Sequence, residues 1–159
     1  MKRLLILSGK GGTGKTTTAA AFIHFSQTRA MADCDVDAPN LHLVAAPPVS
    51  PEISEFLGGE KAVIDPDKCV GCGICASHCR FNALEKEEGR YRVNEYACEG
   101  CGVCAYVCPQ KAVYLAEDVA GRKELYLGER IFSTAVLKMG RGNSGKLVTD
   151  VKMAMLKHA

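Results

Sequence analysis

The sequence contains no tryptophan, and its other large aromatic residues are five phenylalanines and five tyrosines among 159 residues. Any hydrophobic core must therefore be built mainly from aliphatic side chains. The net charge is only +2. A strong basic excess, which is typical of proteins that bind nucleic acids or anionic membrane surfaces, is missing. We therefore expect no nucleic-acid partner.

Long apolar runs are also missing. The N-terminus is basic, but the apolar run that follows covers only residues 4–7. The apolar core of a signal peptide needs roughly 7–15 residues, and a transmembrane helix needs about 20. We therefore expect no membrane span and a cytoplasmic location, where the reducing environment keeps thiols unpaired.

Cysteine, in contrast, is abundant, and eight of the nine cysteines form an internal repeat. Each copy reads C-x2-C-x2-C-x3-C, and the second copy begins at residue 98, 29 residues after the first begins at residue 69. This spacing is that of bacterial ferredoxins with two clusters, in which the fourth cysteine of each copy binds the cluster of the other copy.

We therefore predict two 4Fe-4S clusters with crossed ligands. Arg80, rather than a proline, follows the fourth cysteine of the first copy, which weakens the chain turn at that point but removes no ligand. Zinc ribbons use two separated C-x2-C pairs, and disulfides need an oxidising compartment, so both alternatives are disfavoured. The predicted ligands are Cys69, Cys72, Cys75 and Cys108 for cluster 1, and Cys98, Cys101, Cys104 and Cys79 for cluster 2.

A phosphate-binding motif follows the first apolar run. Residues 4–7 are typical of a short strand buried on both faces of a parallel sheet, and residues 9–16 match G-x-x-x-x-G-K-S/T ahead of an expected helix over residues 15–28. In this motif, backbone N–H groups bind phosphate oxygens, Lys15 contacts the β- and γ-phosphates, and Thr16 coordinates Mg²⁺. The alternative is a glycine-rich turn without a ligand. The residues predicted to bind ATP are Gly9, Lys10, Gly11, Gly12, Thr13, Gly14, Lys15, Thr16 and Thr17.

Three acidic residues at alternate positions, Asp33, Asp35 and Asp37, end a short predicted strand. Carboxylates close to bound phosphates can hold Mg²⁺ through water or orient an attacking water molecule. The alternative is a solvated acidic turn that ends at Pro39.

The remaining pattern predicts three segments. A P-loop domain would cover residues 1–62, with a loop over residues 41–59 that contains one helical turn at 53–57. A cluster domain would cover residues 63–120, with a hairpin over residues 83–93. Residues 121–159 would return to the P-loop domain with a hairpin of two strands at 124–127 and 131–136 and a helix from about residue 146. The predicted fold class is an α/β P-loop NTPase with a partial parallel sheet and an inserted α+β ferredoxin domain.

Residues 9–17, with their second lysine at Lys10, resemble the deviant Walker A motif of the MinD, ParA and nitrogenase iron-protein class. Residues 33–42 and 143–148 resemble the subgroup of MinD-superfamily ATPases that carry an inserted two-cluster ferredoxin domain. This resemblance implies a homodimer in which Lys10 reaches the nucleotide of the partner subunit and Asp35 polarises the attacking water through Mg²⁺. Lys10, Lys15 and Asp35 are therefore the candidate catalytic residues.

The sequence departs from that subgroup in two ways. The segment before Asp33 is short, and no Walker B strand follows the final helix. We expect the chain to be the N-terminal part of a longer ATPase, with the other half on a separate chain or lost, and we expect ATP binding rather than hydrolysis.

The leading interpretation is an iron–sulfur protein that couples ATP binding to electron transfer through two 4Fe-4S clusters, to or from a redox partner protein. One alternative is a ferredoxin-type electron carrier with a vestigial nucleotide-binding region. Another is a protein that delivers iron–sulfur clusters.

Overall fold

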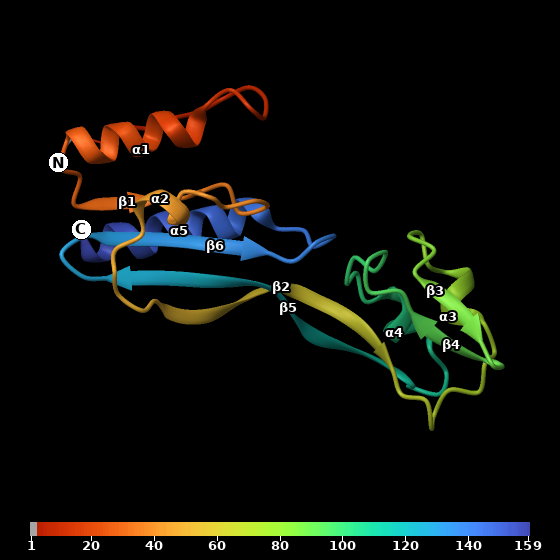
Figure 1. Cartoon of the computed structure of the whole chain (residues 1–159). Helices are drawn as coiled ribbons and strands as arrows, with labels where there is room; N and C mark the ends of the chain where they lie inside the picture. Colours follow the sequence, from red (N-terminus) through yellow and green to blue (C-terminus); the bar gives the residue numbers. More distant parts are fainter. Residues whose placement is uncertain (1–2) are drawn as a thin grey trace. The chain divides into compact units, whose positions relative to one another are not determined.

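The structure is a computed structural model that describes residues 3–159, and the chain divides into two compact units (Figure 1). Unit 1 consists of the chain up to Phe56, Gly121–Met139 and Asn143–Ala159. Unit 2 consists of Leu57–Ala120 and the short segment Gly140–Gly142. Two strands, β2 (Glu52–Ile64) and β5 (Val113–Leu127), continue from one unit into the other. The first stretch of unit 1 therefore ends at Phe56, whereas the predicted P-loop segment extends to residue 62.

The main sheet has the strand order β1-β6-β5-β2 and is mixed. Strand β1 (Ala30–Ala32) runs parallel to β6 (Ile131–Leu137), whereas β5 and β6 form an antiparallel hairpin. The predicted parallel arrangement therefore holds for β1 and β6, whereas β5 and β6 depart from it. The reason is the short connection between β5 and β6, because a tight turn can only join antiparallel neighbours. The two predicted strands of this hairpin are confirmed, although β5 begins at Val113 rather than at residue 124.

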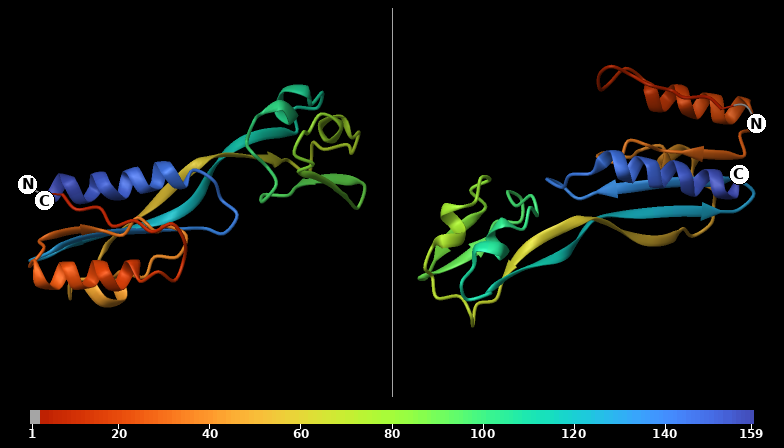
Figure 2. Two further views of the ribbon diagram at one scale, coloured as in Figure 1. Left: turned by 90° about the horizontal axis from the view of Figure 1, so that it is seen from above. Right: turned by 180° about the vertical axis from the view of Figure 1, so that it is seen from behind.

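Helix α5 (Ser144–His158) covers one face of this sheet, against β1 and β6 (Figure 2). Its side chains Leu147 and Val151 are almost completely buried, as are Phe132 and Ala135 of β6. Lysine side chains lie on the exposed side of the helix, which is therefore amphipathic, and the prediction of a helix from about residue 146 is confirmed.

Helix α1 (Lys15–Phe25) begins at the end of the glycine-rich loop and is shorter than predicted. Its Ile23 packs with Met31, Leu41 and Phe132 in the core of unit 1. Phe25, the last residue of the helix, is 84% exposed.

Residues 4–7 form no strand, so this prediction was wrong. The side chains of Leu4, Leu5 and Leu7 are 69%, 72% and 78% exposed. A strand needs a neighbour for its backbone N–H and C=O groups, and within residues 3–159 the sheet provides none for this segment.

The helical turn predicted at residues 53–57 is absent, since these residues belong to strand β2. The short helix of this region is α2 (His42–Ala45). Strand β2 is a neighbour of β5 in the sheet. Pairing with a distant strand has therefore outweighed the local signal in the sequence.

Unit 2 is built from two similar halves, each with a cysteine-containing loop and a short helix. These helices are α3 (Ile74–Ser77) and α4 (Val103–Val107). The predicted hairpin is confirmed as β3 (Leu84–Glu87) and β4 (Arg90–Val93), with antiparallel register.

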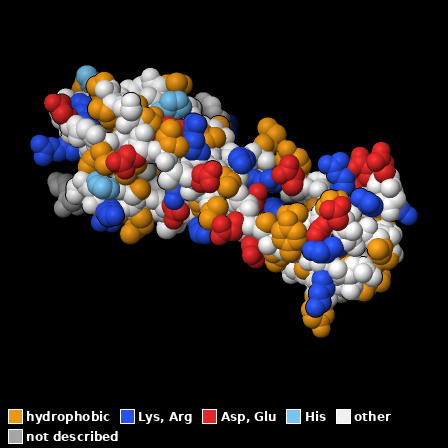
Figure 3. All heavy atoms as spheres, turned by 90° about the horizontal axis from the view of Figure 1, so that it is seen from below, with side chains coloured by type: hydrophobic (Ala, Val, Ile, Leu, Met, Phe, Trp, Pro, Cys, Tyr) orange, Lys and Arg blue, Asp and Glu red, His pale blue; other side chains and the backbone are white. Residues whose placement is uncertain are grey.

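The surface has mixed charge. Acidic and basic side chains are interspersed over the face of the molecule that Figure 3 shows. Among the helices within residues 3–159, none has both the length and the apolar character that a membrane crossing requires.

Candidate functional site

Unit 2 contains two cavities, and four cysteines line each of them. The first cavity is lined by Cys69, Cys72, Cys75 and Cys108. The second cavity is lined by Cys79, Cys98, Cys101 and Cys104. In each case three cysteines come from one copy of the repeat, and the last cysteine of the other copy completes the group. The structure therefore brings together the same sets of four cysteines that the spacing predicts.

The remaining lining of both cavities is mostly apolar. Ile64 and Val113 contribute to the first cavity, and Phe81, Leu84 and Val93 to the second. Four thiols in an apolar cavity are the donor set that a 4Fe-4S cluster uses. Within residues 3–159, no three His, Cys, Asp or Glu side chains converge closely enough to hold a single metal ion. A 4Fe-4S cluster needs four thiolates, one for each iron, and each cavity is lined by four cysteines. The cysteines therefore fit such a cluster.

Two glycines allow the cysteine loops to lie directly against neighbouring backbone. At Gly71 (φ +70°), an added Cβ would lie 2.0 Å from the carbonyl oxygen of Gly89. At Gly100 (φ +64°), it would lie 2.0 Å from the carbonyl oxygen of Glu60. Both the left-handed backbone and the close approach require glycine. These contacts hold the loops against the hairpin and against strand β2, respectively.

Backbone N–H groups donate hydrogen bonds to several of the cysteine sulfurs. Cys98 Sγ accepts from Ala62 at 3.5 Å and from Gly100 at 3.4 Å. Cys79 Sγ accepts from Ala83 at 3.4 Å, and Cys108 Sγ accepts from Ala112 at 3.3 Å. Such bonds stabilise negative charge on sulfur.

Burial, in contrast, disfavours negative charge on the free thiols. Desolvation raises the pKa of Cys75 and of Cys104 above the ordinary thiol value. These two free thiols therefore favour the protonated form, and a bound iron would have to displace their protons. Cys72 and Cys101 are exposed, so one thiol of each set lies at the protein surface.

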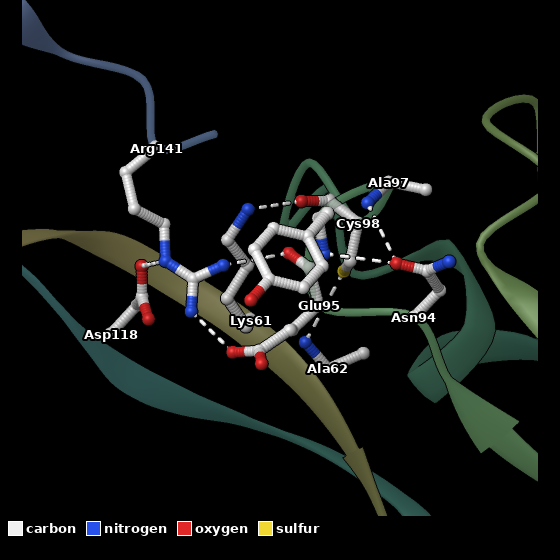
Figure 4. A network of polar contacts seen from close by, with 9 residues as sticks. Lys61, Ala62, Asn94, Glu95, Ala97, Cys98, Asp118 and Arg141 are labelled. Carbon is white, nitrogen blue, oxygen red and sulfur yellow. Dashed lines mark hydrogen bonds and ion pairs between the residues drawn. The ribbon is translucent and has the colours of Figure 1, made fainter. Parts of the chain in front are cut away.

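A polar network lies beside the second cavity (Figure 4). Lys61, on strand β2, donates a hydrogen bond from its Nζ to the carbonyl oxygen of Cys98. The Arg141 side chain is 7% exposed, and its Nε lies 3.0 Å from Asp118 Oδ2. Arg141 also donates to the carbonyl oxygen of Glu95 at 3.0 Å and pairs with the Glu95 carboxylate. Sequence reasoning missed both Lys61 and Arg141, because their partners lie far away along the chain and no local motif marks them.

In unit 1, the glycine-rich loop lies next to the acidic segment. Lys15 Nζ lies 2.8 Å from Asp35 Oδ2, and this hydrogen bond raises the pKa of Lys15 above its ordinary value. Thr16 Oγ1 donates to Asn40 Oδ1 at 2.7 Å. The structure therefore brings Lys15, Thr16 and Asp35 together, while Lys10 is exposed.

Asp33 has a different role from Asp35. It is buried, and its carboxylate accepts hydrogen bonds from the backbone N–H groups of Asp35, Asn40 and Leu41 at 2.9–3.1 Å. These bonds fix the conformation of the loop that carries Asp35. Asp37 is exposed.

Comparison with known proteins identifies one part of the chain. Residues 62–115 match the family described as "4Fe-4S dicluster domain". A ferredoxin of Pyrobaculum islandicum is 37% identical over 67 residues, which cover 42% of this chain and 63% of that protein. An uncharacterised protein of Methanocaldococcus jannaschii is 35% identical over 95 residues, which cover 58% of this chain and 32% of that protein.

The chain therefore spans about a third of one of these relatives and less than two thirds of the other. Neither the matched family nor the description of either relative is that of a P-loop ATPase. Residues 62–115 of this mixed α/β protein are an iron–sulfur domain of the ferredoxin type that binds 4Fe-4S clusters.

Proposed function

We propose that the chain is a ferredoxin-type electron carrier that exchanges electrons with a redox partner protein through two 4Fe-4S clusters. The observation that supports this function is the pair of cavities in unit 2, each lined by four cysteines. Both lie within the segment that matches the dicluster domain. The proposed ligands are Cys69, Cys72, Cys75 and Cys108 for cluster 1, and Cys98, Cys101, Cys104 and Cys79 for cluster 2.

The residues of the chain have distinct tasks in this function. The thiolates hold the irons, and the apolar lining of each cavity limits the access of water. When bound, each cluster supplies one-electron redox chemistry. The exposed thiols of Cys72 and Cys101 give a partner protein a short path to each site. All nine cysteines are unpaired, which supports a reducing compartment such as the cytoplasm.

The first test is the iron and sulfide content of the anaerobically purified protein. Two 4Fe-4S clusters per chain require about eight irons and eight sulfides. Cys34→Ala serves as the control and should keep this content, because Cys34 lies in unit 1 and lines neither cavity. A protein that binds no iron under these conditions would refute the proposed function.

Cysteine variants test the crossed ligands. Under the proposed assignment, Cys79→Ala and Cys98→Ala damage the same cluster, so the remaining electron paramagnetic resonance (EPR) spectra should match. The spectrum of Cys69→Ala should differ from both. If Cys79→Ala instead matches Cys69→Ala, each copy of the repeat binds its own cluster and the crossed assignment is wrong.

A second candidate function is ATP binding in unit 1, coupled to electron transfer in unit 2. It is favoured by the contacts of Lys15 with Asp35 and of Thr16 with Asn40, which place two residues of the phosphate-binding motif beside oxygen groups suited to Mg²⁺. Gly9, Lys10, Gly11, Gly12, Thr13, Gly14, Lys15, Thr16 and Thr17 would surround the nucleotide, with Mg²⁺ on Thr16 and Asp35 orienting water.

Lys10 is exposed, so it is available to a partner subunit in a homodimer or to a complementing chain. Calorimetric titration with MgATP tests this function, and a change in cluster potential on adding ATP would establish the coupling. If MgATP does not bind to protein that contains its iron, the nucleotide function is refuted and the electron-carrier function stands alone. Transfer of clusters to an iron-free acceptor protein would instead favour cluster delivery.

A further inference from the structure

The two cavities differ in the number of hydrogen bonds that their sulfurs accept. Three N–H···S bonds end on sulfurs of the second cavity. Ala62 and Gly100 donate to Cys98, and Ala83 donates to Cys79. In the first cavity, Ala112 donates to Cys108. The sulfurs of Cys75 and Cys104, one in each cavity, also interact with the backbone N–H of the residue that follows, so this contact does not distinguish the two cavities.

The cavities also differ in their nearby lysines. Lys61 is half-buried and donates to the carbonyl oxygen of Cys98, so its ammonium group lies close to the second cavity (Figure 4). No carboxylate within residues 3–159 forms an ion pair with it. Lys68 directly precedes Cys69 of the first cavity, but its side chain is 62% exposed and pairs with Asp65 at 2.9 Å. Solvent and this carboxylate therefore reduce the electrostatic effect of the Lys68 charge on the first cavity.

Other charges beside the second cavity largely cancel or are screened. The buried guanidinium of Arg141 faces the nearly buried carboxylate of Asp118. Glu95 and Glu99 are exposed, so water screens their negative charge. Lys61 therefore provides the positive charge that is neither paired nor fully solvated.

Adding an electron to a cluster increases its negative charge. Hydrogen bonds to the sulfurs and a nearby cation stabilise the more negative state and raise the reduction potential. We propose that the site formed by Cys79, Cys98, Cys101 and Cys104 takes the first electron, and that Lys61 is a positioning residue that sets this order. The inference rests on the proposed two-cluster function. The step is the transfer of one electron from an external one-electron reductant, with no bond formed or broken.

The order of reduction can be tested without altering Lys61. The wild-type protein is reduced with one electron per chain by reduced methyl viologen, and its EPR spectrum is compared with those of the cysteine variants. The expected signal is the one missing from Cys98→Ala and still present in Cys69→Ala. If protein that contains eight irons instead shows the signal that is missing from Cys69→Ala and still present in Cys98→Ala, the inference is overturned, while the two-cluster carrier stays intact.

The role of Lys61 is tested by an EPR-monitored redox titration of Lys61→Gln. Glutamine keeps a hydrogen-bond donor for the Cys98 carbonyl but removes the charge. We expect the higher of the two midpoint potentials to become more negative, with roughly a tenfold change in the oxidised-to-reduced ratio at a fixed potential, or about 59 mV for a one-electron step. Lys61→Arg should restore the wild-type value, and Lys68→Gln should leave both midpoints unchanged. Unchanged midpoints in Lys61→Gln, or a shift of the lower midpoint alone, would overturn the role of Lys61.

Discussion

Replacing Gly100 by alanine adds a single methyl group where strand β2 lies against the second cysteine loop. The new Cβ would lie 2.0 Å from the Glu60 carbonyl oxygen and 3.0 Å from its carbon. The loop would have to move by about 1 Å or more to restore an ordinary van der Waals separation. Alanine in the left-handed region costs about 1–2 kcal/mol, and overpacking adds about 1–3 kcal/mol. Together these costs destabilise the loop conformation that places Cys98 and Cys101 by roughly 2–5 kcal/mol.

Two further glycines make this experiment specific. Gly71→Ala repeats the same clash in the first loop, with the Gly89 carbonyl oxygen at 2.0 Å. Gly89 itself has φ +81°, yet a Cβ there would meet no atom within 4 Å. Gly89→Ala therefore carries the backbone strain without the clash and is the matched control.

The assay is iron and sulfide per chain after anaerobic purification, together with the EPR spectrum of the reduced protein. Gly100→Ala should lose up to about half of the iron, with loss of the cluster 2 signal. Gly71→Ala should lose a similar amount from cluster 1, and Gly89→Ala should keep about eight irons. Full iron content and unchanged spectra in both Gly71→Ala and Gly100→Ala would refute the reasoning, because the close approach would then not constrain the sites.

Three further predictions concern unit 1. Lys15→Ala should abolish MgATP binding in calorimetry while the visible iron–sulfur absorption remains; loss of both would mean that the two sites are not independent. Asp35 raises the pKa of Lys15, so the stabilisation by this ion pair is intact below pH 10.5 and is lost as the pH rises through the higher folded-state pKa. At pH 10, Asp35→Asn should therefore speed acylation of Lys15, as followed by mass spectrometry, and equal rates would contradict the pairing. Leu147→Ala, in the fully buried face of α5, should lower the free energy of unfolding by about 2–5 kcal/mol, whereas exposed Met153→Ala should change it by less than about 0.5 kcal/mol in urea titrations.

The cysteine groups could be predicted from the sequence because most of their geometry is local. Three cysteines of each set share one short loop, and only the fourth has to arrive from the other copy. The hairpin formed by β3 and β4 was predictable for the same reason. Its turn residues Glu88 and Gly89 both have positive φ, which suits a two-residue hairpin turn.

The features that were not predicted depend on distant partners. Residues 4–7 have the composition of a buried strand, but composition does not supply a neighbouring strand. Strand β2 contains charged residues and two glycines, so its local signal is weak, and its pairing with β5 decides its conformation. Lys61 and Arg141 contact groups that lie far away along the chain, and no spacing in the sequence links them.

The connection of unit 2 to the rest of the chain bears on whether this module could be transplanted. The segment Leu57–Ala120 enters and leaves through β2 and β5, which are neighbours in one sheet, so a host protein could receive it between two adjacent strands. Arg141 would not travel with that segment, because it comes from a separate stretch of sequence. Asp118, only 12% exposed at its side chain, would then be left as a largely desolvated carboxylate without its cation. A working transplant therefore needs either a host-supplied arginine at that position or Asp118→Asn.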